Sequence, residues 1–132
     1  MVLWIQISTG TDTPVYQQII EQIGEAVARG QLRSGDKLPA VRKLAAELVI
    51  NPNTVARAYT QLEQSGLVTT KKGSGTFISD PQHRQKDIAD INLLTERMDT
   101  LIARALNLGM STDETCVLFG ERLDKFLKER KT

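Results

Sequence analysis

The chain of 132 residues has little cysteine, little histidine and no long apolar run. One cysteine, Cys116, excludes an intramolecular disulfide, and there is one histidine, His83. The sequence has no cluster of metal ligands, no phosphate-binding glycine loop and no nucleophile–base pair. No apolar run approaches the ~20 residues that cross a bilayer, and no basic-then-apolar leader opens the chain. We therefore expect a cytoplasmic, non-enzymatic protein without a cofactor, a metal or a membrane partner.

The chain also has almost no excess of one charge sign, since its formal net charge is only +1. This balance argues against an indiscriminate nucleic-acid binder. The distribution is uneven, however: residues 33–72 hold seven basic and three acidic residues, whereas nine basic and ten acidic residues follow from Asp80 onward. A local charge of +4 ahead of a nearly neutral tail favours a DNA-binding head with a different task at the back.

Two short helices joined by a sharp turn are predicted after Pro39. Apolar residues recur there with the spacing of one helical face: Val41, Leu44, Ala45 and Leu48. Asn51 can cap a second helix (about 51–65), and Pro52 suits its first position, where no backbone donor is needed. That helix has its own apolar stripe: Val55, Ala58, Tyr59 and Leu62. Since only three residues separate the helices, the pattern predicts a helix-turn-helix.

A basic hairpin is predicted next. Residues 67–71 and 76–79 have the threonine, valine and aromatic content of strands, and Lys-Gly-Ser-Gly at 72–75 joins them. Lysines beside glycines suit a phosphate backbone or a minor groove, so we interpret about 71–76 as a wing. The alternative is a solvated hairpin whose lysines only protect an edge from aggregation.

Another amphipathic helix is predicted from Thr13 to Arg29, with Thr13 as its cap and Pro14 in its first position. Before it, residues 2–7 are β-prone, and we expect an N-terminal strand that extends the sheet or covers a dimer seam. Trp4 is interpreted as a packing residue. The predicted head therefore spans 1–79: a mainly α fold with a small β wing, an N-terminal winged helix-turn-helix.

A linker (80–85) and a helical tail (86–132) complete the predicted organisation. The first tail helix carries a seam of apolar residues at steps of three and four: Ile91, Leu94, Met98, Leu101, Ala105 and Leu108. The second continues the pattern: Cys116, Phe119, Leu123 and Phe126. Ser111 and Glu114 form an S-x-x-E capping box for it.

Two helices of about 20 residues cannot enclose a core alone. We expect this C-terminal two-helix dimerisation hairpin to pair with a second copy as a four-helix module. The alternative is that both helices fold back on their own head. The tail is too small for a large effector pocket, which leaves open an unknown small-molecule effector at the dimer interface or beneath the head.

The strings LPAVRKLAAEL, NPNTVARAY, LEQSGLV and KKGSGTFI, in this order, resemble the DNA-binding domain of GntR-type bacterial transcription regulators. The NPNTV form of the second helix and the short helical tail are similar to the YtrA subfamily. The resemblance covers residues 13–79 strongly and the tail more loosely. It implies a homodimer that binds a palindromic double-stranded DNA operator, usually as a repressor.

The resemblance also implies DNA contacts. Arg42 matches an arginine that contacts bases, while Asn51, Asn53 and Thr54 match the start of the recognition helix. The wing tip and one further arginine complete the predicted DNA-binding set: Lys72, Gly73 and Arg57. Arginine and asparagine side chains can read guanine and adenine bidentately. Secondary contacts with phosphates are expected from Arg33 and Lys71. For Arg33 and for Lys37, the two options are a phosphate contact and plain surface charge.

The chain departs from the family pattern at several positions. Pro52 and Ala56 stand where some members have arginine, so base contacts of those members are not carried over. Ala40 replaces a common capping serine, and Val49 stands where glycine is frequent in the turn.

Each assignment has an alternative. Arg42 could pair with Glu47, Asn51 could act only as a cap, and Arg57 could be solvated or bound to a phosphate. For the whole chain, the alternatives are a winged-helix protein-interaction module and a fragment related to regulator heads fused to aminotransferase-like enzymes.

Overall fold

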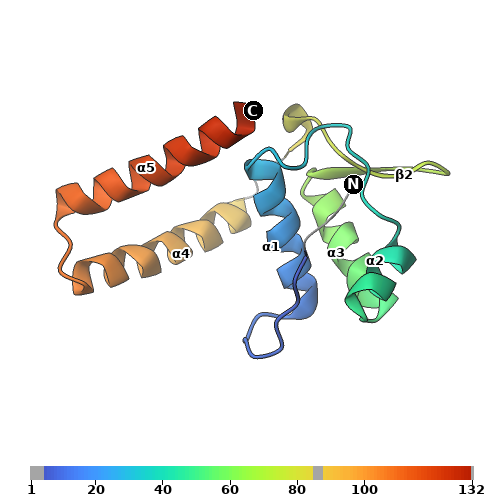
Figure 1. The fold of residues 1–132 in the computed structure, drawn as a ribbon, viewed down its shortest axis with the longest axis horizontal. Coiled ribbons are helices and arrows are strands. Elements are labelled where there is room, and N and C mark those ends of the chain that lie inside the picture. The colour runs from blue at the N-terminus through green and yellow to red at the C-terminus, as the bar shows by residue number, and fades with distance from the viewer. Residues whose placement is uncertain (1–4, 85–87, 132) are drawn as a thin grey trace. The chain divides into compact units, whose positions relative to one another are not determined.

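The computed structural model describes residues 5–84 and 88–131, which belong to two compact units, Met1–Gln85 and Lys86–Thr132 (Figure 1). Residues 5–84 of the first unit form three helices, a hairpin and a 3-10 turn: α1 (Val15–Ala28), α2 (Val41–Leu48), α3 (Pro52–Gln64), β1 (Val68–Lys71), β2 (Gly75–Ile78) and η1 (Pro81–His83). The second unit contains α4 (Ile88–Asn107) and α5 (Thr112–Lys131). The predicted fold class, a winged helix-turn-helix followed by a two-helix hairpin, is confirmed.

The core of the head lies where α3 packs against α1, α2 and β1. The apolar stripe predicted for the second helix is buried as a whole: Val55, Ala58, Tyr59 and Leu62. Ile19 and Ile23 of α1 meet it and are fully excluded from solvent. Leu32 and Leu38, from the connection between α1 and α2, are buried in the same cluster. Because this core fixes three sides of α3, the remaining face is available to a partner.

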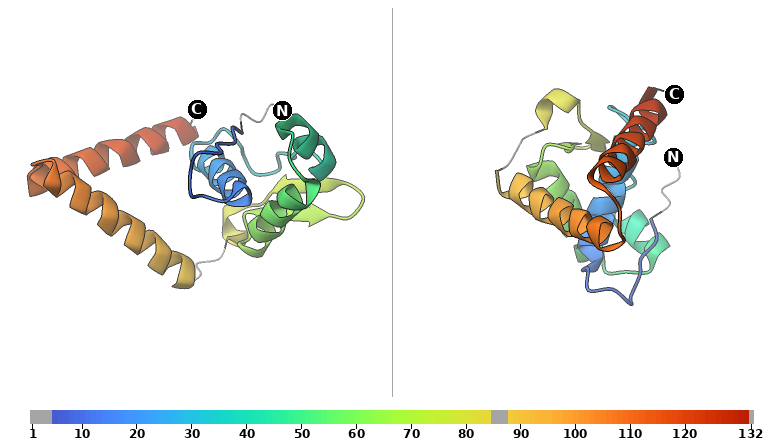
Figure 2. Two further views of the ribbon diagram at one scale, coloured as in Figure 1. Left: turned by 90° about the horizontal axis from the view of Figure 1, so that it is seen from below. Right: turned by 90° about the vertical axis from the view of Figure 1, so that its left-hand side faces the viewer.

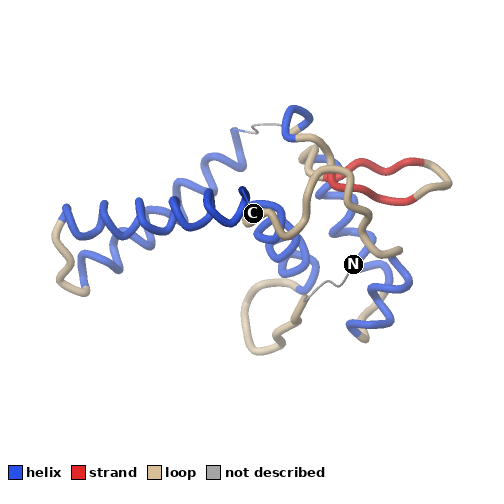
Figure 3. Tube along the Cα trace, turned by 45° about the horizontal axis from the view of Figure 1, so that its top comes forward, coloured by secondary structure: helices blue, strands red, loops and turns tan. Residues whose placement is uncertain are grey.

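The wing is an antiparallel hairpin that runs from Val68↔Ile78 at its base to Lys71↔Gly75 at its tip. Val68 and Ile78 are buried, whereas the rest of β1 is exposed. Figure 3 shows the two strands reaching away from the helices of the head. The loop before α2 pairs with β2, since the backbone N–H of Leu38 donates to the carbonyl of Thr76 at 2.8 Å. The wing is therefore tied to the start of the helix-turn-helix.

The predicted N-terminal strand is wrong for Ile5–Ile7, and residues 1–4, including Trp4, lie outside the described part of the chain. The carboxamide of Gln22 takes the place of a partner strand: its Oε1 accepts from the N–H of Gln6 at 2.9 Å and its Nε2 donates to the carbonyl of Gln6 at 2.7 Å. Gln18 bonds the backbone of Ser8 in the same way, at 2.8 and 2.9 Å. Side chains of α1 thus take the hydrogen bonds of Gln6 and Ser8 that a neighbouring strand would otherwise make.

The predicted cap of α1 is also wrong. Pro14 is the N-cap residue, and no side chain caps the helix. The carbonyl of Thr13 instead accepts a hydrogen bond from Nε2 of Gln18 at 2.9 Å. Gln18 is buried and binds both ends of the preceding loop, which fixes the entry of the chain into α1.

In the second unit, α4 and α5 run antiparallel and diverge from the turn that joins them (Figure 2). The capping box predicted for α5 is confirmed. The N–H of Glu114 donates to Oγ of Ser111 at 3.1 Å, and the N–H of Ser111 donates to Oε1 of Glu114, also at 3.1 Å. Among the described residues, no helix is both long and apolar enough to cross a membrane.

Candidate nucleic-acid interface

The turn between α2 and α3 is closed by a left-handed residue. Val49 has φ 56° and ψ 52°, and its N–H donates to the carbonyl of Ala46 at 3.3 Å. The N–H of Ile50 then donates to the carbonyl of Ala45 at 3.0 Å. Glycine is the ordinary residue for this conformation, and a β-branched one is strained in it. The side chain of Val49 is 88% exposed, so its packing does not offset the backbone strain. Its role is to turn the chain into α3.

The N-terminus of α3 is capped and faces solvent. Oδ1 of Asn51 accepts from the N–H of Asn53 at 2.8 Å, so the cap predicted from the sequence is present. Pro52 occupies the first turn. Asn51 and Asn53 are exposed, whereas Thr54 is half-buried. A helix N-terminus that presents polar groups and a partial positive charge suits a phosphate or a base edge.

A hydrogen bond holds α3 to the start of α2. The hydroxyl of Tyr59 donates to the carbonyl of Pro39 at 2.8 Å. Burial raises the pKa of the Tyr59 phenol far above its ordinary value, so the group remains a donor even at strongly alkaline pH. This bond sets the relative position of the two helices of the motif.

Arg57, on the second turn of α3, stacks on an aromatic ring of α1. Its guanidinium carbon lies 3.8 Å from the centroid of the Tyr16 ring. The Arg57 side chain is nevertheless exposed, and Tyr16 is half-buried. None of the states considered from the sequence (base-contacting, solvated or phosphate-bound) included this contact.

Arg42, on the first turn of α2, is exposed. The alternative that it pairs with Glu47 is not observed, since Arg42 makes no ion pair within residues 5–84 and 88–131. Arg33 is more constrained. Its Nε donates to the carbonyl of Gly30 at 3.2 Å, and its backbone N–H donates to Oδ2 of Asp36 at 2.8 Å. Arg33 therefore braces the loop after α1, while its guanidinium remains at the surface.

The tip of the wing is basic and exposed. Lys71, Lys72 and Gly73 are all open to solvent, and Gly73 has φ 81° in the turn. Nζ of Lys71 lies 5.1 Å from the centroid of the Phe77 ring, within reach of a cation–π contact. Lys37 also belongs to this surface, because its backbone bridges to Phe77. The sequence suggested Lys37 only as one of two options, because its place beside the wing depends on a long-range pairing.

The residues predicted for the dimer seam lie on the apolar face of the hairpin. All of them except Phe126, which is half-buried, are exposed in this single chain: Ile91, Leu94, Met98, Leu101, Leu108, Phe119 and Leu123. An apolar groove of about 1090 Å³ runs between α4 and α5, bordered by Met98, Leu101, Leu108 and Phe119.

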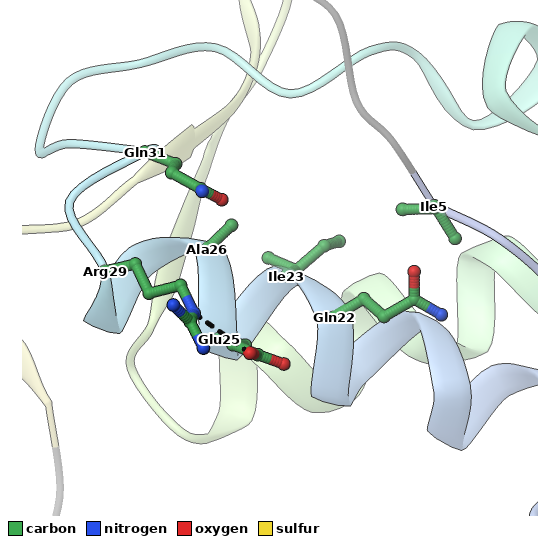
Figure 4. Close-up of a pocket in the computed structure, with 7 residues that line it drawn as sticks. All are labelled: Ile5, Gln22, Ile23, Glu25, Ala26, Arg29 and Gln31. Carbon is green, nitrogen blue, oxygen red and sulfur yellow. Dashed lines mark hydrogen bonds and ion pairs between the residues drawn. The ribbon is translucent and has the colours of Figure 1, made fainter. Parts of the chain in front are cut away.

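A small hollow of about 240 Å³ lies beside α1 in the head (Figure 4). Ile5 and Ile23 form apolar parts of its wall. Three of its polar side chains are engaged with neighbouring groups: Nε of Arg29 lies 3.0 Å from Oε1 of Glu25, and Gln22 holds the backbone of Gln6. A small hollow in which most polar side chains are already engaged gives a ligand little to recognise.

Comparison with known proteins agrees with this geometry. The family described as "Bacterial regulatory proteins, gntR family" matches residues 15–78, which include α1, the helix-turn-helix and the wing. The HTH-type transcriptional repressor YtrA of Bacillus subtilis (strain 168) is 37% identical over 125 residues, covering 95% of this chain and 90% of the relative.

Solved structures extend the similarity to the tail. A transcriptional antiterminator from Listeria monocytogenes EGD-e aligns with a TM-score of 0.72 at 32% identity, over 89% of this chain and 87% of the other. YtrA from Sulfolobus acidocaldarius, a GntR-family transcription factor, aligns with a TM-score of 0.55 at 34% identity, over 92% and 97% of the two chains. The chain belongs to the GntR family of DNA-binding transcription regulators, among its YtrA-like members.

Proposed function

We propose that the protein is a homodimeric repressor that reads a palindromic operator with α3 and grips the DNA backbone with its wing. The observation that carries this proposal is the exposed, capped N-terminus of α3, presented by a head whose wing carries lysines at its tip. The repressor role is supported by the similarity to the Bacillus subtilis repressor YtrA.

Base reading is assigned to Asn53, Arg42 and Arg57, which have exposed side chains with donors suited to base edges. Asn51 has a narrower role. Its Oδ1 is occupied by the cap, so its Nδ2 is the group left for DNA. Thr54, half-buried, can contribute through the first turn of the helix.

Contacts with the DNA phosphate backbone are assigned to Lys71, Lys72 and Gly73 at the wing. Lysines there neutralise phosphates, and a glycine lets the chain approach the groove closely. Arg33 adds a phosphate contact from the loop after α1. These contacts set affinity and salt dependence but carry no sequence information themselves.

Dimerisation is assigned to the hairpin, because its two helices leave a continuous apolar face uncovered. Leu101 and Phe119 are 63% and 58% exposed, and they border the groove between α4 and α5. Exposed apolar surface of this extent is typical of an interaction surface. A second copy offers a face of the same chemistry, and the isologous pairing closes a four-helix module.

If the regulator responds to an effector, we propose that the effector binds at this same interface. The hollow beside α1 is small, whereas the groove between α4 and α5 is wide and apolar. A ligand seated there would act on dimer geometry and so on the spacing of the two heads.

Sedimentation equilibrium and footprinting test the proposal together. The wild type should sediment as a dimer and protect two related half-sites upstream of its gene. Leu101→Glu places a charge in the seam and should give a monomer without a footprint. The matched control, Thr100→Glu, adds the same charge at the neighbouring exposed position of α4 and should stay dimeric. A wild type that is monomeric, or that protects a single site, would contradict the proposal; protection without sequence preference would favour a protein-interaction module.

A further inference from the structure

We infer that Tyr16, a residue of α1 outside the helix-turn-helix, is a positioning residue for operator reading by Arg57. The inference rests on the proposed function, since it requires α3 to meet DNA. It assigns a role in operator binding to a helix that otherwise serves as scaffold.

The contact between Arg57 and Tyr16 is close, and the Tyr16 ring is held in place by the core of the head. The guanidinium carbon of Arg57 lies 3.8 Å from the centroid of the Tyr16 ring, which is the distance of a face-on stack. Tyr16 packs against the core of the head, next to the fully buried residues of α1. The ring is therefore held by the fold, and the arginine is held by the ring.

Stacking occupies the flat face of the guanidinium and leaves its N–H donors, which lie in the plane of the group, open to another partner. The Arg57 side chain remains exposed while it is stacked. An arginine that is already confined to one orientation loses less side-chain entropy when it forms a hydrogen bond. The stack thus prepares Arg57 for a base or phosphate without blocking it.

Tyr16 could instead act in either of two ways that substitutions can distinguish. If its hydroxyl touched a phosphate directly, the hydroxyl and not the ring would matter. If the ring only stabilised the head, its loss would lower the melting temperature without a DNA effect that depends on Arg57. The ring, the hydroxyl and the arginine can each be removed separately.

The test measures operator affinity by fluorescence anisotropy for Tyr16→Phe, Tyr16→Leu, Arg57→Ala and the double variant Tyr16→Leu/Arg57→Ala, in the full chain. Tyr16→Phe keeps the ring and should bind as the wild type does. Tyr16→Leu should weaken operator binding by about two- to fivefold, the effect of an exposed cation–π contact. In the Arg57→Ala background, Tyr16→Leu should change nothing further. Melting curves identify any variant that is not folded, and Tyr16→Met serves as a second ring-free variant.

The inference is overturned if Tyr16→Leu binds as tightly as the wild type, if Tyr16→Phe loses as much as Tyr16→Leu, or if the loss persists without Arg57. Failure of the proposed function looks different. In that case, the wild-type protein itself would show no preference for its operator over a scrambled duplex.

Discussion

Cε of Lys37 lies 2.7 Å from the place where a Cβ on Gly75 would stand. Gly75 has φ 125°, a conformation that side chains rarely adopt, and it opens strand β2 of the wing. The absence of a side chain there lets the stem of Lys37 cross the wing backbone. Lys37 pairs through its own backbone with Phe77, so the loop before α2 and the wing form one surface.

Replacing Gly75 by alanine should therefore disturb both the wing and Lys37. The left-handed conformation should cost about 1–3 kcal/mol of unfolding free energy. The displaced lysine should also weaken DNA binding without a change in sequence preference. Urea denaturation and anisotropy measure the two effects. Gly24→Ala in the middle of α1 is the control: a Cβ there meets nothing within 4 Å, so alanine should stabilise the helix by about 0.5–1 kcal/mol. A Gly75→Ala protein as stable as the wild type would refute the account of the wing.

Val49→Gly should stabilise the head. It relieves a β-branched residue of a left-handed conformation, while little packing is lost from a side chain that is 88% exposed. We expect a net gain of about 0.5–1 kcal/mol, because the relief exceeds the extra chain entropy of glycine. Chemical denaturation measures it, with Val49→Ala as the intermediate case. A loss of stability in Val49→Gly would mean that the exposed valine has a packing role that the turn geometry does not show.

Asn51 allows capping and DNA binding to be separated. Asn51→Ala removes the acceptor for the N–H of Asn53 and should cost about 1 kcal/mol of stability. Asn51→Asp keeps the acceptor and should keep the stability, but its negative charge should weaken DNA binding. Thermal melts and anisotropy on the same preparations measure the two effects. Equal DNA binding by Asn51→Asp and the wild type would remove Asn51 from the interface.

The capping box of α5 predicts a pH dependence. Hydrogen bonds from the backbone N–H of Ser111 and then from its side chain hold the pKa of Glu114 below its ordinary value. Since the folded pKa is lower than the unfolded one, the carboxylate stabilises the hairpin above the unfolded pKa. That contribution is lost as pH falls through the folded pKa.

Carbon-13 NMR of the glutamate side chains should show this lowered pKa, and far-UV circular dichroism should show helix loss at acid pH. Glu114→Gln can still accept from Ser111 but does not titrate, so its hairpin should lack this part of the pH response. A Glu114 pKa at or above the ordinary glutamate value would contradict the capping geometry.

Local features of the fold could be predicted from the sequence because they depend on short spacings. The stripe from Val55 to Leu62 and the box of Ser111 and Glu114 lie within one or two helical turns, and both are present. The β-prone residues before α1 gave a wrong strand, because the competing partner was the side chain of Gln22, 16 residues away. No pattern of neighbouring residues predicts that a glutamine side chain will take the place of a partner strand.

In the candidate site, too, features set by short spacings could be predicted, whereas contacts between distant residues could not. Exposure of Arg42 and Asn53 follows from helical periodicity and agrees with the structure. Two contacts arise only when distant segments pack: the stack of Arg57 on Tyr16 and the crossing of Lys37 over Gly75. Neither separation in sequence corresponds to a helix or hairpin spacing, so periodicity could not reveal them.

The most direct test is anisotropy with a labelled duplex from the region upstream of the gene, at two salt concentrations, against a scrambled duplex. We predict that the wild type prefers its own duplex, that Arg42→Ala and Asn53→Ala lose that preference, and that the dimer survives in both. Lys72→Ala should weaken binding to both duplexes and reduce the salt slope by about 1. Equal binding of the wild type to the two duplexes, or variants that bind as the wild type does, would contradict the assignment of α3 and the wing as the DNA-reading surface.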